Sequence, residues 1–224
     1  IVLNNGVKIP QLGLGTWFID DDKVADAVKA AVEIGYRHID TAQAYGNERG
    51  VGEGVRTCGI PRDELFVVSK VAAEHKTYEE AMAGINETLE KMGLDYLDMM
   101  IIHSPQPWAK VNQCEDRYVE GNRAAWKALE DAYKAGKLKA IGISNFLIED
   151  IASLLETAKI KPMVNQMETH PLNQQKTLKE WADKYDIRLE AWAPFGEGRN
   201  GLFENEVLKA IGQKYGKSTA QVML

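Results

Sequence analysis

The sequence predicts one α/β domain, residues 1–224, of the (β/α)8 TIM-barrel class, with an N-terminal β-hairpin and without an eighth βα unit. Three observations favour this class. Short β-rich runs alternate with longer helical patterns, no linker interrupts the alternation, and a hairpin-like turn precedes the first strand. Such alternation predicts a parallel sheet with right-handed crossovers. The even spacing of the units favours a barrel over a doubly wound sheet.

Asn5 and Gly6 predict the first element, a tight hairpin in residues 1–10, because Asn-Gly suits the positive φ angles of a two-residue turn. Strands are then expected at residues 12–16, 37–42, 65–70, 96–103, 139–144, 163–168 and 187–192. Helices are expected between them, at residues 47–58, 77–92, 121–134, 147–159, 174–185 and from 205 onward.

The first helix lies between the first two strands, and its pattern also predicts its ends. Val24, Val28 and Ala31 fall on one helical face. The aspartates at residues 20–22 predict its N-cap, because carboxylates accept hydrogen bonds from free backbone N–H groups. Gly35 predicts its end, since glycine readily adopts the left-handed conformation that terminates helices.

The strand count leaves the barrel one strand short. Seven strands leave two exposed sheet edges, which soluble proteins avoid. Residues 218–224 resemble the start of a helix that stops within its pattern. We therefore expect the natural chain to continue for roughly another βα unit of ~30 residues. The mass of the intact protein would test this expectation.

Composition excludes several classes of protein. Hydrophobic residues make up 45% and charged residues 27%, which excludes disordered and fibrous chains. The net charge of −6 disfavours nucleic acid and anionic membranes as partners. Apolar runs such as residues 99–102 are too short to span a bilayer, and the N-terminus shows no signal peptide. Cys58 and Cys114 are expected to be free thiols in a cytoplasmic, monomeric protein.

Polar side chains stand at the carboxyl ends of the expected strands, where barrel enzymes carry their catalytic groups. Asp40, Lys70 and His103 follow one another at intervals of 30 and 33 residues, about one βα unit each, so all three reach the same rim. Tyr45 lies five residues after Asp40, in the loop above that strand. The other residues at strand ends are Thr16, Asn145, Gln166, Glu168 and Trp192.

This cluster suits the protonation of a carbonyl oxygen. A buried Lys70 ammonium needs a counter-charge, which Asp40 on the adjacent strand can supply. A nearby ammonium is expected to lower the pKa of Tyr45 from roughly 10 to roughly 7, which takes about 4 kcal/mol. Tyr45 would then donate a proton to an oxygen that becomes an alkoxide, and His103 would orient that oxygen. The cluster holds no electron source, so a reduction needs a cofactor.

Taken singly, these residues have simpler explanations. A strand-end Lys or Asp is more often a solvated surface charge, and a lone His is more often a core residue. Four such residues at successive strand ends favour a functional site. Two glycine patterns are not dinucleotide fingerprints: Gly13 and Gly15 lack the third glycine, and residues 50–54 lie in a helical pattern rather than after a strand.

Five stretches resemble motifs of the aldo-keto reductase family, in particular its bacterial diketogluconate and methylglyoxal reductases. The stretch RHIDTAQAYGNE at residues 37–48 resembles the family signature. The others are the strand that ends at Lys70, residues 94–103 with His103, and the motifs GISNF at 142–146 and VNQ at 164–166. The resemblance runs from the hairpin to Leu224.

The resemblance implies an NADPH-linked reduction of aldehydes or ketones. It implies that Tyr45 is the general acid, that Lys70 and Asp40 tune it, and that His103 positions the carbonyl. Trp17 and Trp108, with His103, would form the substrate wall. The implied cofactor site consists of Gly15, Thr16, Asp40, Ser144, Asn145, Gln166, Trp192, Pro194, Phe195 and Gly196.

Two features depart from the family pattern. Ser104 follows His103, where many relatives carry Trp, so a differently shaped substrate pocket is expected. The family's basic motif for the adenosine 2′-phosphate follows the eighth strand, so NADPH rather than NADH is inferred here from the family alone.

Three alternatives use the same residues differently. In a class I aldolase, Lys70 would form a Schiff base with a carbonyl substrate. In a metal-dependent hydrolase, His38 with Asp40 and Glu168 with His170 would supply ligands, although Lys70 would repel the ion. A non-catalytic, cofactor-binding interaction protein would have no need of the strand-end set.

Overall fold

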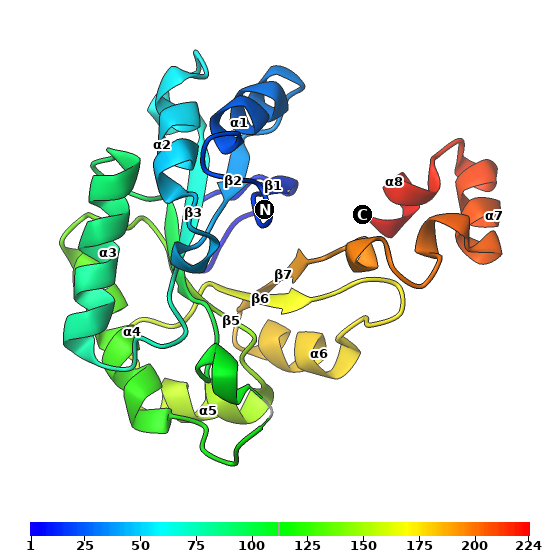
Figure 1. The fold of residues 1–224 in the computed structure, drawn as a ribbon. Coiled ribbons are helices and arrows are strands. Elements are labelled where there is room, and N and C mark those ends of the chain that lie inside the picture. Colours follow the sequence, from blue (N-terminus) through cyan, green and yellow to red (C-terminus); the bar gives the residue numbers. More distant parts are fainter. Residues whose placement is uncertain (112) are drawn as a thin grey trace.

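Seven parallel strands form the centre of the molecule and curl into a nearly closed barrel (Figure 1). The computed structural model describes residues 1–111 and 113–224. Each strand pairs with the next one along the chain, which confirms the predicted TIM-barrel architecture, with seven strands in the described residues. The strands are β1 (Gly13–Gly15), β2 (His38–Asp40), β3 (Phe66–Val71), β4 (Met99–Ile102), β5 (Ile141–Ser144), β6 (Val164–Glu168) and β7 (Arg188–Trp192).

Helices connect the strands and cover the outside of the sheet (Figure 1). Parallel pairing of consecutive strands requires such crossover connections. Beyond β7, two helices form a lobe that stands apart from the body of the molecule. The helices are α1 (Val24–Glu33), α2 (Glu48–Thr57), α3 (Tyr78–Met92), α4 (Val119–Lys134), α5 (Ile148–Leu155), α6 (Lys176–Lys184), α7 (Glu206–Tyr215) and α8 (Thr219–Met223).

The predicted N-terminal hairpin is present as a tight turn closed by one antiparallel bridge, between Val2 and Lys8. Gly6 adopts a φ of 84°, the left-handed conformation that the Asn-Gly pair predicts. The Asn4 amide donates hydrogen bonds to the carbonyls of Pro162 and Asp186, at 2.9 and 3.1 Å. These contacts attach the hairpin to the segments that precede β6 and β7.

The N-terminus of α1 differs from the prediction. Lys23 is the N-cap, and no side chain caps the helix there. The Asp21 carboxylate instead accepts a hydrogen bond from the backbone N–H of Gly50 in α2, at 2.7 Å. A β-carbon on Gly50 would lie 2.1 Å from the Asp21 carbonyl oxygen, so α1 and α2 meet too closely for any larger residue. The other end is as predicted, because Gly35 follows α1 with a φ of 110°.

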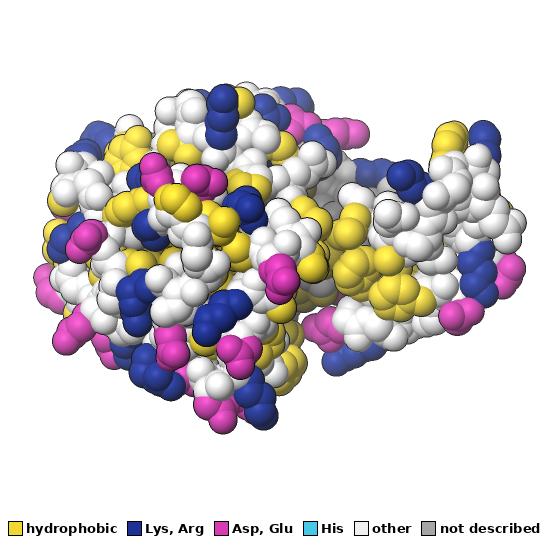
Figure 2. Space-filling model, turned by 90° about the horizontal axis from the view of Figure 1, so that it is seen from above, with side chains coloured by type: hydrophobic (Ala, Val, Ile, Leu, Met, Phe, Trp, Pro, Cys, Tyr) yellow, Lys and Arg dark blue, Asp and Glu magenta, His cyan; other side chains and the backbone are white. Residues whose placement is uncertain are grey.

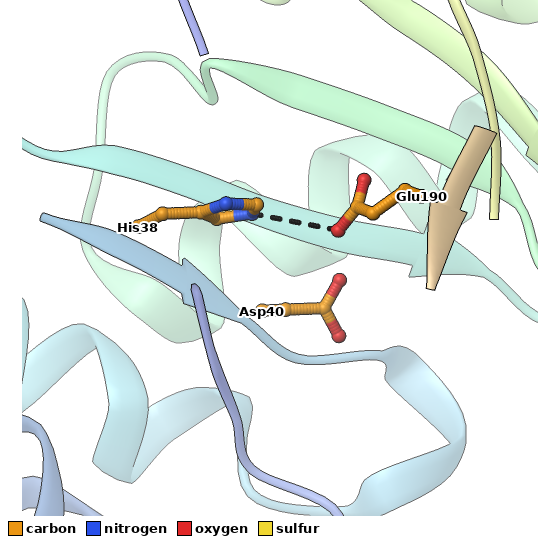
Figure 3. Close-up of side chains that lie close together, drawn as sticks. All are labelled: His38, Asp40 and Glu190. Carbon is orange, nitrogen blue, oxygen red and sulfur yellow. Dashed lines mark ion pairs between the residues drawn. The ribbon is translucent and has the colours of Figure 1, made fainter. Parts of the chain in front are cut away.

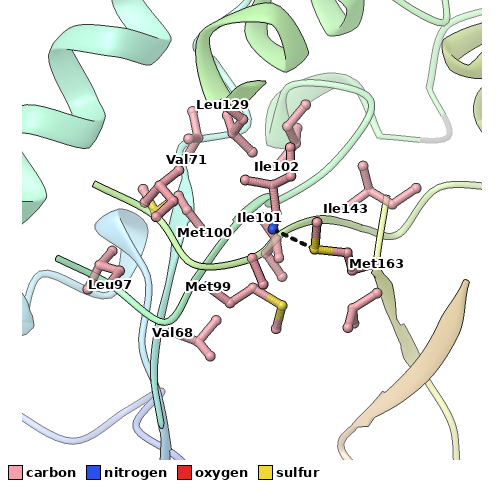
Figure 4. Packing of buried hydrophobic residues seen from close by; sticks show 14 of the residues in the cluster. Val68, Val71, Leu97, Met99, Met100, Ile101, Ile102, Leu129, Ile143 and Met163 are labelled. Carbon is pink, nitrogen blue, oxygen red and sulfur yellow. Dashed lines mark hydrogen bonds between the residues drawn. The ribbon is translucent and has the colours of Figure 1, made fainter. Parts of the chain in front are cut away.

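The hydrophobic core surrounds β4, whose four residues are completely buried. Figure 4 shows their side chains packed with those of β3 and β5 and with Leu129 of α4. The sulfur of Met163 accepts a hydrogen bond from the backbone N–H of Ile141, at 3.3 Å. Burial of one such side chain contributes about 1.5–3 kcal/mol, so this side of the barrel carries much of the stability.

The surface mixes acidic and basic side chains, and hydrophobic side chains gather in the hollow between the body and the α7–α8 lobe (Figure 2). Cys58 and Cys114 are free thiols, as predicted. Within the described residues, no helix combines the length and the apolar character that crossing a membrane demands.

Candidate active site

A cavity of about 1530 Å³ runs from the N-terminal hairpin along the inside of the sheet to the carboxyl ends of the strands and extends toward the α7–α8 lobe. Most of the polar residues that the sequence placed at strand ends line it. They include Asp40, Tyr45, His103, Ser144, Asn145, Gln166, Glu168 and Trp192, with Gly15, Trp17, Trp108 and Pro194 from the loops and β1. Lys70 is completely buried directly behind this wall.

Asp40, Lys70 and Tyr45 meet at one point, as the strand spacing predicts. The Lys70 ammonium forms an ion pair with the Asp40 carboxylate and donates hydrogen bonds to the Thr41 carbonyl, at 2.9 Å, and the Tyr45 hydroxyl, at 3.3 Å. Tyr45 ends a 3-10 turn, Gln43–Tyr45, that directly follows β2. The Gln43 side chain accepts a hydrogen bond from the backbone N–H of Ala72, which attaches this turn to the chain after β3.

The pKa of Tyr45 is raised above its ordinary value, not lowered as the sequence led us to expect. Burial is the main cause, because the phenolate loses hydration. The Lys70 charge opposes this rise, while the Asp40 charge adds to it. For Lys70, burial favours the neutral amine, but the charge of Asp40 and the hydrogen bonds to Asp40 and Tyr45 outweigh it and raise its pKa above the ordinary value. The site therefore pairs a neutral phenol with an ammonium ion.

His103 faces Tyr45 across the cavity wall. Its ring lies edge-on to those of Tyr45 and Trp108, with centroids 5.6 and 4.8 Å away. Burial, and then the positive charge of Lys70, lowers the pKa of His103 to about 2. The imidazole is thus neutral at physiological pH and carries one N–H donor. Its Nδ1 atom has no hydrogen-bond partner among the described residues.

A second polar group connects β5, β6 and β7. Asn145 adopts a left-handed φ of 62° and lines the cavity. Its amide donates to the His103 carbonyl and accepts from the Trp192 indole, both at 3.0 Å. The Ser144 hydroxyl donates to the Gln166 carbonyl at 2.9 Å. Side-chain amides, which donate and accept, therefore lie beside a large aromatic ring.

The remaining predicted residues lie at the margins. Thr16 is buried and its hydroxyl donates to the Asp40 carbonyl at 3.0 Å, so it attaches β1 to β2. The half-exposed Trp17 ring stacks toward Tyr45, with centroids 6.3 Å apart. Phe195 packs instead against a neighbouring ring after β7, and Gly196 packs against Leu202. Pro194 is thus the part of the predicted loop, residues 194–196, that lines the cavity.

Glu190 also belongs to the site, although no pattern in the sequence singled it out. Its carboxylate accepts a hydrogen bond from the Gln166 amide at 3.0 Å and lies 3.8 Å from the ring nitrogen Nε2 of His38 (Figure 3). Gln166 also donates to Asp40, at 2.9 Å. Burial raises the pKa of Glu190 above its ordinary value. The available signal was its spacing, because residues 190 and 192 of one strand share a face.

The ligand set expected for a metal-dependent hydrolase is not the one that the structure groups. Among the described residues, His38 and Asp40 lie with Glu190, their ligand atoms within 4.8 Å of one another. Glu168 and His170 form a separate contact, 3.0 Å between carboxylate oxygen and ring nitrogen, and do not belong to that group.

Comparisons with known proteins agree on one family. The model of the aldo/keto reductase family matches residues 11–224. The chain is 44% identical to the glyoxal reductase of Bacillus subtilis (strain 168), over 225 residues that cover 100% of this chain and 76% of the relative. It is 44% identical to the 9,11-endoperoxide prostaglandin H2 reductase of Trypanosoma cruzi (strain CL Brener), with the same coverage. It is 39% identical to the methylglyoxal reductase DkgA of Escherichia coli (strain K12), covering 100% and 77%.

Solved structures give the same result. An aldo/keto reductase from Brucella melitensis superposes with a TM-score of 0.90 and 38% identity, covering 100% of this chain and 81% of that one. A Bombyx mori aldo-keto reductase in complex with NADP superposes with a TM-score of 0.87 and 32% identity, covering 100% and 78%.

Proposed function

The chain belongs to the aldo/keto reductase family and is an oxidoreductase that acts on carbonyl groups, and from that premise we propose its reaction. It reduces aldehydes or ketones to alcohols, with NADPH as hydride donor and Tyr45 as proton donor. One observation carries the proposal: the Lys70 ammonium is buried between the Asp40 carboxylate and the Tyr45 hydroxyl, which lies 3.3 Å from it at the cavity wall.

Proton transfer follows from the electrostatics of this trio. The raised pKa of Tyr45 keeps the phenol protonated at neutral pH, so the proton is available. As the carbonyl oxygen becomes an alkoxide, it is the stronger base and takes the Tyr45 proton. The phenolate left behind accepts the hydrogen bond that Lys70 already donates. Asp40 keeps Lys70 charged, so that this stabilisation is present when the phenolate forms.

The neutral state of His103 suits it to orient the substrate. With its pKa lowered to about 2, the imidazole can donate its N–H to the carbonyl oxygen without competing with Tyr45 as an acid. Trp17 and Trp108 flank the same opening and supply apolar walls. Their aromatic faces suit small or flat carbonyl compounds.

The residues present fit a nicotinamide cofactor. The cavity extends over the carboxyl ends of β5, β6 and β7, where Ser144, Asn145, Gln166 and Trp192 line it. When bound, NADPH supplies the hydride. Ser144, Asn145 and Gln166 offer the mixed donors and acceptors that a carboxamide needs, and Trp192 offers a face for stacking. Of the further cofactor contacts that the resemblance implies, Gly15, Asp40 and Pro194 line the cavity, whereas Thr16, Phe195 and Gly196 do not line it.

The aldolase alternative is disfavoured by the state of Lys70. A Schiff base requires a neutral amine, whereas Asp40 raises the pKa of this amine and holds it as an ammonium. The buried ammonium also donates to three oxygen atoms, on Asp40, Thr41 and Tyr45.

Turnover of Tyr45→Phe tests the proposal. Oxidation of NADPH and of NADH would be followed with a panel of carbonyls that starts from glyoxal and methylglyoxal, the substrates that two relatives' names indicate. We expect loss of about 10²–10⁴-fold in kcat, the usual contribution of a general acid. NADPH affinity, measured by fluorescence, should stay near wild type, and full activity in the variant would exclude Tyr45 as the acid.

A further inference from the structure

A buried charge imbalance lies beside the proposed catalytic trio. Asp40 of β2 and Glu190 of β7 face each other across the barrel interior, bridged by the Gln166 amide. The side chains of Asp40 and Glu190 are 12% and 21% exposed, and Lys70 is paired with Asp40. One ammonium thus serves two carboxylates. The Oε2 atom of Glu190 is buried and, among the described residues, accepts no hydrogen bond.

The nearby His38 turns its ring nitrogen Nε2 toward the Glu190 carboxylate. Its side chain is 3% exposed, and its Nδ1 lies 3.3 Å from the carbonyl oxygen of Pro10. A carbonyl oxygen only accepts hydrogen bonds, so Nδ1 donates to it and Nε2 is the ring nitrogen that is left to bind a ligand. Nε2 is aimed at Glu190, 3.8 Å away, and has no hydrogen-bond partner in the described part of the chain (Figure 3).

The His38 ring is held in this orientation by its packing. A β-carbon on Gly13 would lie 2.8 Å from Nδ1, so β1 passes directly against the ring. The Phe66 ring contacts it edge-on at a centroid distance of 5.3 Å. Metal-binding histidines commonly donate their second ring N–H to a backbone carbonyl, which fixes the ring and its tautomer. The Pro10 contact supplies that arrangement.

We propose that His38 Nε2, the Oδ2 atom of Asp40 and the Glu190 carboxylate form a binding site for a divalent transition-metal ion, with Zn²⁺ as the best match. Imidazole nitrogen and carboxylate oxygen are both zinc ligands. Zinc ligand atoms lie roughly 3.4 Å apart in a tetrahedral site, and these lie within 4.8 Å of one another. Rotation of the Glu190 side chain, whose Oε2 accepts no hydrogen bond among the described residues, would shorten the distances between the ligand atoms to those of a zinc site.

Two neighbours adjust when the ion binds. The Gln166 amide now donates to both carboxylates, and turning the amide over presents its oxygen to the ion instead. Lys70 repels a cation, but it occupies Oδ1 of Asp40, whereas Gln166 occupies Oδ2. The ion therefore competes with Gln166, and not with Lys70, for an oxygen of Asp40. All three ligands line the cavity, which gives the ion a route of entry.

Isothermal titration of the protein with Zn²⁺ alone tests the site. Glu190→Gln keeps the size of the side chain but removes the charge, and we expect it to weaken Zn²⁺ binding at least tenfold. We expect the same loss for His38→Asn, which removes the imidazole nitrogen. The matched control is Glu168→Gln, which removes the carboxylate of the other His–Glu contact and should leave binding unchanged. Equal affinity in wild type and Glu190→Gln, or loss of binding only in Glu168→Gln, would overturn the proposal.

Cobalt gives a second, spectroscopic readout that reports on the ligands around the ion. Co²⁺ bound to nitrogen and oxygen ligands at low coordination number absorbs visible light, and this absorption should appear in wild type and be absent from Glu190→Gln. A spectrum in Glu190→Gln that equals the wild-type spectrum would contradict the assignment of Glu190 as a ligand.

A consequence for turnover rests on the proposed function. Because Asp40 and Gln166 belong to both sites, Zn²⁺ should inhibit NADPH-dependent reduction in wild type and do so at least tenfold less effectively in Glu190→Gln. The two proposals fail separately: a protein without reductase activity still binds Zn²⁺ in the calorimeter, whereas an active enzyme that binds no Zn²⁺ overturns only the metal site.

Discussion

Strands β4 and β7 belong to one sheet but have opposite surroundings. β4 is an apolar run, Met99–Ile102, whose residues are all completely buried. β7, Arg188–Trp192, alternates polar and apolar residues, and none of them is fully buried. In the described residues β4 pairs on both sides and β7 only with β6. Continuous apolar runs are typical of strands covered on both faces.

This difference separates stability from chemistry. The β4 side consists of closely packed hydrophobic residues, and the four residues of β4 do not line the cavity. The β7 side contributes Glu190 and Trp192 to the cavity wall, opposite Asp40 of β2. Substitutions at β4 should therefore change mainly the free energy of unfolding, whereas those at β7 should change mainly binding.

The largest expected effect is at β4. Met100→Ala removes a completely buried side chain and leaves a cavity, which should lower the free energy of unfolding by about 2–5 kcal/mol. Urea unfolding followed by circular dichroism would measure it. A loss below about 1 kcal/mol would mean that this side of the barrel collapses around the gap, and the contrast with β7 would not hold.

A smaller, pH-dependent effect is expected at His103, on the cavity wall after β4. Burial and the charge of Lys70 lower its pKa to about 2, against 6.5 for an ordinary histidine. Below pH 6.5 the folded state then binds fewer protons than the unfolded state. The free energy of unfolding is therefore highest above the pKa of the unfolded histidine and falls as the pH drops from 6.5 toward 2. From pH 7 to pH 5 wild type should lose about 2 kcal/mol that His103→Gln does not.

Urea midpoints at the two pH values would measure this difference. Met100→Ala serves as the comparison, because it removes no titratable group and should lose as much on acidification as wild type does. Identical acid sensitivity in wild type and His103→Gln would show that the imidazole is not held neutral by burial.

The smallest effect is expected at β7 itself. Leu189 is partly exposed, so Leu189→Ala should lower the free energy of unfolding by about 1 kcal/mol, well below the loss at Met100. The same urea titration gives the value. A loss equal to that of Met100→Ala would show that β7 is packed as tightly as β4.

Much of the fold was predictable because its signals are local. Alternating patterns located the strands to within a few residues, and Gly35 and Gly93 end α1 and α3 in the left-handed conformation. The N-cap of α1 was wrong because the carboxylate of Asp21 is used by α2. A cap signal shows that an acceptor is available, and the packing of the two helices decides which N–H group receives it.

The candidate site divides in the same way. The spacing of Asp40, Lys70 and His103 predicted their meeting, since parallel strands of regular connection length bring their carboxyl ends together. The direction of the Tyr45 pKa was not predictable, because it depends on how deeply the hydroxyl is buried as well as on the charge beside it. Glu190 was missed because its partner His38 lies 152 positions earlier in the chain.

The sequence alone determined the order of the elements, the faces of the strands and the set of polar groups at one rim, because these follow from periodicity and spacing along the chain. Tertiary structure decided which groups touch and how much water each retains. Burial and long-range neighbours arise only when distant segments pack, and they set the protonation states on which the proposed chemistry depends.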